Sequence, residues 1–387
     1  MLHNLGLIGF IVKKKPLIYL ILVAGLCCFI ELASFLTGKF LETKGVFYIE
    51  QQDLHDYAQY LKARDPVMGW PAKNDLLWYD KSGSRIIPSY PDPDKFKSCV
   101  STYGDSYTFG DEVDHEHAWS NILSQLLKCR VANYGVGGYG TDQAFLRFQE
   151  NLYDEAKVVL LGFLSENITR NVNQFRNLLG YTRYGLKPRF IVNREGMIEL
   201  IPLPILSREE YINLVKQPNA YLTHEFFLLD GPSGITKLRF PFTLSILRSL
   251  TNYQMKANLL GRPHFAEFCD ENHPSGGFIV TEKIITSFYD LAIKRGKKPV
   301  IIFFPSCRDL EYFKKNQRWL FQKLLDRLND DGIYPLNLGP AMIAYLKDRN
   351  PCSICYTCST HYNEEGNSLV AKLIYNYLKC HELIRFH

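Results

Sequence analysis

The chain has 387 residues, of which 46% are hydrophobic, so it is long enough to bury one large core or two modest ones. Its 45 basic and 40 acidic residues nearly balance, and the sequence has no basic stripe interleaved with aromatic residues. This distribution excludes nucleic-acid binding as an expected function. The 24 Tyr, 25 Phe and 4 Trp favour an aromatic-rich core over a carbohydrate-facing surface.

Residues 16–38 form an apolar run of 23 residues that one charge, Glu31, interrupts. At 1.5 Å per residue, a helix of this length crosses the roughly 30 Å hydrocarbon core of a bilayer, so we expect a transmembrane anchor. A cleaved signal peptide remains the alternative, because Ala33-Ser34 offers a small-residue cleavage site. Under both interpretations Lys13-Lys14-Lys15 keeps residues 1–15 in the cytoplasm, and the chain from about residue 45 onward is extracytoplasmic.

Residues 46–96 carry frequent turn signals, such as Asp65-Pro66 and Pro91-Asp92-Pro93, and few long apolar runs. We expect a helix over residues 51–64. An irregular segment should follow it and wrap around the next domain.

From residue 97 the pattern alternates between strands and helices. The sequence predicts strands over 98–103, 130–134 and 157–163, and helices over 117–127 and 141–152. The third strand is a nearly continuous apolar run, which is typical of a strand buried on both faces. The alternation predicts a parallel sheet with crossover helices.

Residues 170–277 interrupt this rhythm, and we interpret them as an insertion that forms a cap or lid. The expected elements are a hairpin over 189–192 and 197–201 and helices over 208–216 and 243–252. The alternation then resumes with a helix over 280–295, a strand over 298–305, a helix over 310–328, a strand over 333–338 and a helix over 363–378. The α/β domain therefore spans residues 97–380.

Four polar blocks each lie beyond the carboxyl end of a predicted strand. They are Gly104-Asp105-Ser106, the glycine-rich residues 133–141, Ser165-Glu166-Asn167, and residues 361–367, which begin with His361. Parallel strands place such segments at one edge of the sheet, where open α/β sheets bind ligands. A serine, a glycine N–H, an asparagine amide and a histidine supply a nucleophile, oxyanion donors and a base, which are the parts of an acyl-transfer site.

With these blocks the chain resembles the SGNH (GDSL-type) hydrolase superfamily over roughly residues 97–169 and 297–380. The third block keeps only Asn167 of the usual Gly-x-Asn-Asp. The resemblance implies a flavodoxin-like three-layer α/β/α fold with a parallel sheet. It also implies that Ser106 is the nucleophile and His361 the general base. The backbone N–H groups of Ser106 and Gly138 and the side-chain amide of Asn167 would then form the oxyanion hole.

The family commonly carries an Asp two or three residues before the histidine, where it orients the imidazole. Ser359 and Cys358 stand at those positions here, and neither has a carboxylate. Either a Ser106–His361 dyad operates with Ser359 or a backbone carbonyl holding the ring, or the site is impaired.

Two clusters offer metal-ligand residue types. Cys352, Cys355, Cys358 and His361 resemble a Cys₃His zinc set, but all four lie within ten residues, so we favour a disulfide within the cysteine cluster or plain packing. The acidic and histidine side chains of residues 111–117 favour a solvated helix N-terminus. We therefore predict no metal and no cofactor. The glycosylation sequon that begins at Asn167 is interpreted as chance.

These features predict a membrane-anchored, extracytoplasmic serine esterase. Its expected substrate is an ester, such as an acetyl group, on a glycan, a cell-envelope polymer or an acylated small molecule. Two alternatives stay open: an O-acetyltransferase that uses a sugar hydroxyl instead of water, and a non-catalytic glycan-binding or assembly component on a degenerate SGNH scaffold.

Overall fold

The computed structural model describes residues 4–50, 61–62, 64–69, 77–180 and 185–384, without the side chains of residues 4–15. A five-stranded parallel sheet lies at the centre, in the order β2-β1-β3-β6-β7. Its strands are β1 (Ser98–Tyr103), β2 (Arg130–Asn133), β3 (Val158–Leu164), β6 (Lys298–Phe304) and β7 (Leu336–Asn337). Counted among the parallel strands this is the order 2-1-3-4-5 of flavodoxin-like folds, so the predicted fold class is confirmed.

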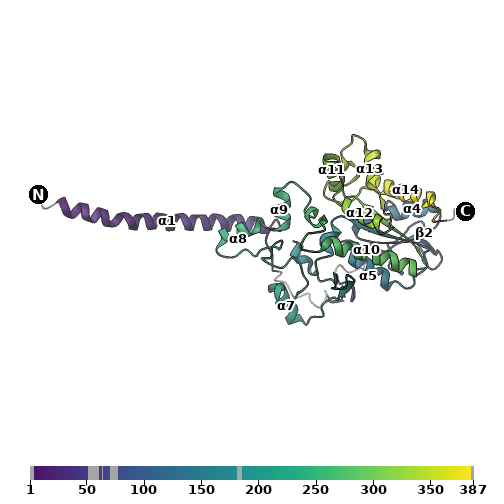
Figure 1. The fold of residues 1–387 in the computed structure, drawn as a ribbon, viewed down its shortest axis with the longest axis horizontal. Coiled ribbons are helices and arrows are strands. Elements are labelled where there is room, and N and C mark those ends of the chain that lie inside the picture. Colours follow the sequence, from purple (N-terminus) through teal and green to yellow (C-terminus); the bar gives the residue numbers. More distant parts are fainter. Residues whose placement is uncertain (1–3, 51–60, 63, 70–76, 181–184, 385–387) are drawn as a thin grey trace.

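Helices cover both faces of this sheet and make a three-layer α/β/α arrangement. α4 (Trp119–Leu127) and α14 (Glu364–Cys380) pack together on one face, and α5 (Thr141–Glu150) and α10 (Gly277–Lys294) pack on the other (Figure 1). All seven residues of β3 are buried, which explains its continuous apolar sequence. The strands and helices predicted over residues 98–163 are confirmed to within two residues at each end.

The helix predicted over residues 310–328 is wrong as a single element, because the chain forms α11 (Cys307–Asn316) and α12 (Gln322–Asp330). Gln317 adopts a left-handed conformation (φ 53°) that ends α11. The buried Trp319 then stacks on Phe313, with ring centroids 4.1 Å apart, and turns the chain back. The strand predicted over 333–338 shortens to β7, and an unpredicted helix, α13 (Gly339–Leu346), follows it.

The segment from residue 170 to 277 contains the predicted antiparallel hairpin of β4 (Arg189–Val192) and β5 (Ile198–Ile201) and the predicted helix α7 (Arg208–Lys216). The helix predicted over 243–252 is corrected to α8 (Phe242–Ser249), because the Asn252 side chain caps a separate helix, α9 (Tyr253–Leu259). Short helical turns complete the fold: α3 (Ser106–Phe109), α6 (Asn167–Arg170), η1 (Arg176–Leu179), η2 (Pro218–Ala220), η3 (Ala266–Cys269) and η4 (Pro351–Ile354). The helix predicted over 51–64 lies largely outside the described residues.

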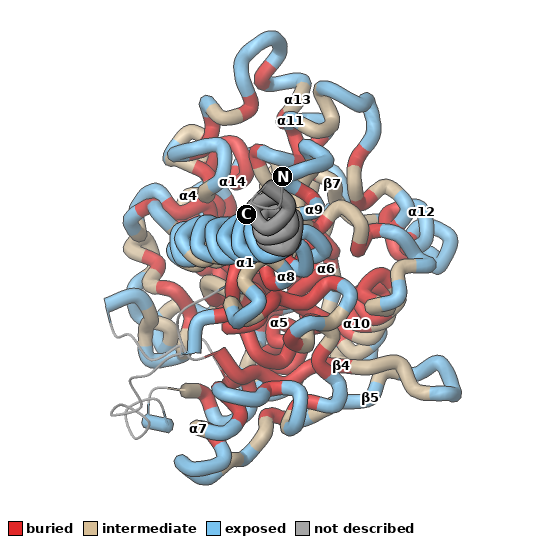
Figure 2. The backbone as a smooth tube through the Cα atoms, turned by 90° about the vertical axis from the view of Figure 1, so that its left-hand side faces the viewer, coloured by how far each residue is buried: buried red, intermediate tan, exposed pale blue. Residues whose placement is uncertain are grey.

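A long N-terminal helix, α1 (Asn4–Glu42), projects from the domain (Figure 1). Residues 16–42 of this helix form a stretch that is long and apolar enough to cross a membrane. Most of these residues are exposed, whereas the centre of the α/β domain is buried (Figure 2).

Three disulfides cross-link the domain: Cys99–Cys129, Cys307–Cys355 and Cys352–Cys358. The predicted bond within the cysteine cluster is therefore present, but Cys355 pairs outside it, with Cys307 on α11. Disulfides persist in oxidising compartments, so together with the N-terminal apolar helix they indicate a secretory, extracytoplasmic setting.

A fully buried ion pair ties the segment between residues 170 and 277 to the sheet domain. Lys187 donates its ammonium to the Asp142 carboxylate on α5 and, at 2.9 Å, to the carbonyl of Pro188. Burial lowers the pKa of Lys187, and Asp142 acts against this effect. The charge is therefore kept in the core by one counter-ion.

We expect Lys187→Met to lower the free energy of unfolding by about 3–5 kcal/mol, because it leaves the Asp142 carboxylate buried without a counter-charge. The double variant Lys187→Met/Asp142→Asn should recover a large part of this loss. Denaturant unfolding of wild type, the two single variants Lys187→Met and Asp142→Asn, and the double variant measures both effects. Losses of the single variants that simply add in the double variant would contradict the coupling.

Candidate active site

Ser106 is the first residue of α3, directly after β1. Asp105 caps this helix, since its Oδ1 accepts the N–H groups of Tyr107 (3.0 Å) and Thr108 (3.4 Å). A residue with a side chain does not fit in place of Gly104, because a Cβ at this position would lie 2.0 Å from Thr108 Oγ1. The Gly-Asp-Ser turn therefore sets the serine at the strand-to-helix junction.

Asn133, the first residue of the glycine-rich block 133–141, fixes the C-terminal end of α3. Its Nδ2 donates to the Thr108 carbonyl (2.8 Å) and to Ser120 Oγ (3.0 Å), and its Oδ1 accepts the N–H of Gly135 (2.9 Å). A Cβ on Gly135 would lie 2.5 Å from the backbone nitrogen of Phe109. The glycine loop that carries Gly138 (φ 81°) thus packs directly against the helix that carries Ser106.

Asn167 begins α6 and is completely buried. Its Oδ1 accepts a hydrogen bond from Arg170 Nη1 (3.2 Å), whereas its Nδ2 has no partner among the described residues. A buried donor without a partner costs roughly 1–3 kcal/mol, so an acceptor that reached this amide would be stabilised there. Its burial also agrees with the interpretation of the sequon as chance.

Arg170 contacts the Gly-Asp-Ser turn, the glycine-rich loop and the Ser165-Glu166-Asn167 block. No sequence signal marks this residue as part of the site. Its Nη1 donates to the Tyr139 carbonyl (3.0 Å) and to Asn167, its Nη2 donates to Glu166 Oε1 (3.0 Å), and Nη1 lies 3.6 Å from Asp105 Oδ2. Although burial acts in the opposite direction, Arg170 and His264 hold the pKa of Glu166 well below its usual range. One buried guanidinium therefore sets the relative positions of the three loops.

Ser106 and His361 line the same cavity, of about 200 Å³, together with Arg170, His264 and Arg308. No hydrogen bond joins the side chains of Ser106 and His361 among the described residues. Such contacts are often long until substrate binds. Gly138 and Asn167, the other predicted site residues, do not line this cavity in the part of the chain that is described.

The structure gives His361 a carboxylate neighbour that the sequence analysis did not identify. Glu112 Oε1 lies 3.3 Å from His361 Nδ1, without hydrogen-bond geometry, and Oε2 accepts the backbone N–H of His361 at 3.3 Å. Cys358, one of the two predicted ring-orienting residues, is instead joined to Cys352, and no hydrogen bond joins Ser359 to the ring among the described residues. Glu112 has φ 72°, a left-handed conformation that is uncommon for residues other than glycine.

Arg85 holds the loop that carries Glu112. Its completely buried guanidinium donates to four carbonyls at 2.7–2.9 Å, those of Phe109, Gly110, Val113 and Asp114. Burial lowers its pKa to about 10, and Asp111 acts against this effect. Arg85 lies in the segment predicted to be irregular, where a single arginine carries no sequence signal.

The two clusters of metal-ligand residue types make other contacts. Cys352, Cys355 and Cys358 all form disulfides, so no thiol of the proposed Cys₃His set is free. In residues 111–117, Asp114 Oδ1 accepts the backbone N–H of His117 at 2.9 Å and lies 2.7 Å from its Nδ1.

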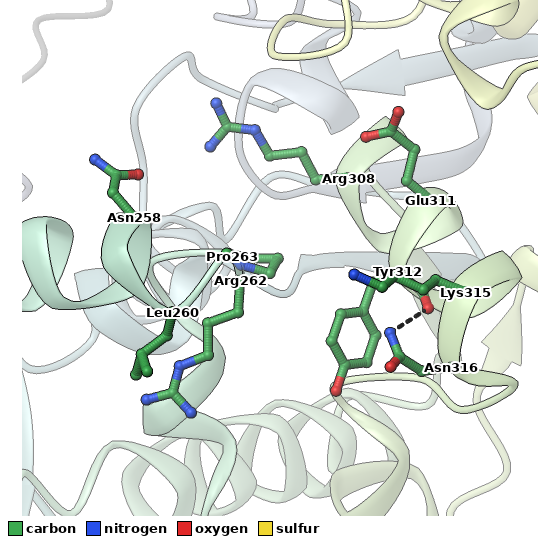
Figure 3. A pocket seen from close by; sticks show the side chains of 10 residues that line it. Asn258, Leu260, Arg262, Pro263, Arg308, Glu311, Tyr312, Lys315 and Asn316 are labelled. Carbon is green, nitrogen blue, oxygen red and sulfur yellow. Dashed lines mark hydrogen bonds between the residues drawn. The ribbon is translucent and has the colours of Figure 1, made fainter.

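A second cavity, of about 560 Å³, shares Arg308 with the first one. Arg308, Glu311, Tyr312 and Lys315 follow a helical spacing on α11, and residues 258–263 form the opposite wall (Figure 3). Three cationic side chains, those of Arg262, Arg308 and Lys315, line this cavity together with the carboxylate of Glu311. This polar cavity therefore adjoins, at Arg308, the one that Ser106 lines.

No family model and no curated protein matches the sequence. The solved structures that it matches include a lipolytic protein of the G-D-S-L family from Desulfitobacterium hafniense DCB-2, at 11% identity and a TM-score of 0.35 over 72% of this chain and 97% of that chain. A G-D-S-L family member from Veillonella parvula DSM 2008 matches at 11% identity and a TM-score of 0.36, with 72% and 97% covered. A two-domain esterase (CEX) active on acetylated mannans matches at 12% identity and 0.34, with 73% and 49% covered. At these values the similarity says nothing about the activity of this chain.

We expect Arg170→Met to lower the free energy of unfolding by about 3–5 kcal/mol, because the carboxylates of Asp105 and Glu166 lose their buried counter-charge. Arg170→Lys should lose less, since it keeps the charge but not the forked geometry. Thermal unfolding compares both with Arg194→Lys on the exposed β4–β5 turn, which should match wild type. An Arg170→Met protein as stable as wild type would contradict this role.

Proposed function

We propose that this chain is a serine esterase of SGNH type, with Ser106 as the nucleophile and His361 as the general base. The observation that carries the proposal is that these two side chains line one cavity. Ser106 also starts a helix after a parallel strand, where the backbone N–H groups and the local positive potential favour an oxyanion.

The reaction has two halves. Ser106 Oγ attacks the ester carbonyl carbon while His361 accepts its proton, and the resulting oxyanion is bound by the N–H groups of Ser106 and Gly138 and by Nδ2 of Asn167. The C–O bond to the alcohol then breaks, and His361 returns the proton to the leaving oxygen. Water, deprotonated by His361, cleaves the acyl-serine in the same way. The unpaired Nδ2 of Asn167 supports its assignment as a donor.

Glu112 takes the place of the acid that the family carries before the histidine. Because its two oxygens face Nδ1 and the backbone N–H of His361, it favours the tautomer protonated on Nδ1. That tautomer leaves the Nε2 lone pair for Ser106. Arg85 keeps Glu112 in place by binding the carbonyls on both sides of it.

The proposed substrate is an ester, such as an acetyl group, on a glycan or a cell-envelope polymer. The support is the polar second cavity, which offers Tyr312 and three cations to groups on either side of the reacting ester. This mechanism needs no cofactor.

We further propose that α1 remains attached as a single-pass anchor, with residues 1–15 in the cytoplasm and the catalytic domain outside. The support is that α1 packs on the domain through residues on both sides of the small-residue site at Ala33-Ser34. Glu31 and Phe35 both contact Phe242, at the N-terminal end of α8.

We expect the full-length chain in neutral detergent to hydrolyse 4-nitrophenyl acetate. Ser106→Ala and His361→Gln should each lower kcat by roughly 10³-fold or more, because either change disables the nucleophile. Equal rates for wild type and Ser106→Ala would contradict the esterase. Product analysis with an oligosaccharide acceptor separates hydrolysis from acetyl transfer to sugar.

We expect Glu112→Gln to lower kcat by roughly 10²–10⁴-fold, as the loss of an orienting acid does in triads, with little change in KM. The melting temperature should stay close to that of wild type, since the Glu112 side chain is partly exposed (38%). Glu116→Gln removes the same charge from the same loop, and its side chain has no contact with His361 among the described residues. Equal kcat values for the two variants would refute the orienting role.

A further inference from the structure

Exposed apolar side chains gather on and next to α8, and further exposed leucines follow at the end of α9. Phe240 is 71% exposed, Leu247 57% and Leu259 68%, and three further leucines, Leu244, Leu250 and Leu260, are more than 40% exposed. Exposed apolar side chains that cluster in this way mark a contact surface rather than a water-facing one. α8 lies beside the end of α1, whose side chains are also apolar and exposed (Figures 1 and 2).

The only charge in the apolar run of α1 caps α8. Glu31 Oε2 accepts the N–H of Phe242 at 2.6 Å, and its Oε1 lies 3.4 Å from the N–H nitrogen of Thr243. An uncompensated Asp or Glu near the centre of a spanning helix disfavours insertion by a few kcal/mol. The free N–H groups at the start of α8 satisfy this carboxylate, so Glu31 no longer counts against a membrane span.

Further contacts run along α1 at helical spacing. Ser34 Oγ lies 2.9 Å from Thr243 Oγ1, and the ring centroids of Phe35 and Phe242 are 4.9 Å apart. Gly38 faces the Leu238 side chain, which leaves no room for a Cβ there. From Gly38 to Glu31 a helix rises about 10 Å, so residues 238–242 descend along α1 by about that distance.

Some of the polar backbone groups of this descending segment find partners within the segment. Ser245 Oγ accepts the N–H of Arg239 at 3.2 Å and donates to the Arg239 carbonyl at 2.8 Å. The Ser245 N–H donates to the carbonyl of Pro241, and Pro241 has no N–H of its own. Internal satisfaction of backbone groups is the condition for entering hydrocarbon.

We propose that residues 238–250 insert into the outer leaflet of the bilayer beside α1 and contact lipid directly through Phe240, Leu244 and Leu247. The apolar surface of this segment continues that of α1, which argues for lipid rather than a protein partner. The inference rests on the proposed anchor and not on the esterase chemistry.

The test measures lipid contact with a fluorophore in nanodiscs. The full-length chain, with its four unpaired cysteines replaced by Ala, receives one cysteine at Leu247, Val23 or Ile205 for labelling with an NBD probe. Val23 reports on α1, and Ile205, which is 90% exposed, is the matched apolar control in the same insertion. Doxyl-labelled phosphatidylcholine quenches a probe only where it contacts acyl chains.

We expect blue-shifted emission and loss of most of the fluorescence at positions 247 and 23, and no loss at 205. Quenching at 23 without quenching at 247 would overturn the lipid contact while leaving the anchor intact. Absence of quenching at both positions would overturn the anchor and the lipid contact together. Blue-shifted emission at 247 without lipid quenching would identify a protein partner instead, and would also overturn the proposal.

Discussion

The buried guanidinium of Arg170 is the interaction on which the arrangement of the candidate site depends. It contacts Asp105 beside the serine, the Tyr139 carbonyl in the glycine loop, and the Glu166-Asn167 pair. Each of these loops follows a different strand, so nothing in the sheet itself fixes their relative positions. A charged group can stay buried here because carboxylates and carbonyls surround it, and those same groups are the supports of the proposed oxyanion donors.

Arg85 fixes the loop next to His361, as Arg170 fixes the loops around Ser106. By binding four carbonyls of residues 109–114, it stabilises a loop in which Glu112 takes a left-handed conformation. Strained backbone persists only where the surroundings over-determine it, and such places cluster at functional sites. The carboxylate that faces His361 therefore comes from the loop after the nucleophile, rather than from the residues before the histidine.

The sheet, the crossover helices and the four blocks could be predicted because their signals are local. The apolar run of β3 and the Gly-Asp-Ser turn can each be recognised from a few consecutive residues. By contrast, Glu112 and His361 are 249 residues apart in sequence, and their contact exists only after folding. The break at Gln317 had no signal either, because a non-glycine residue with positive φ is not recognisable from its type. Arg85 and Arg170 were missed since a single buried arginine looks like any surface arginine.

The most direct measurement of the central claim is covalent mapping of the nucleophile. The full-length chain in neutral detergent is treated with a fluorophosphonate probe, and its peptides are analysed by mass spectrometry. The account predicts one adduct, on Ser106, which is absent in Ser106→Ala and forms much more slowly in His361→Gln. An unlabelled wild-type protein, or labelling that persists at another residue when Ser106 is replaced, would contradict it.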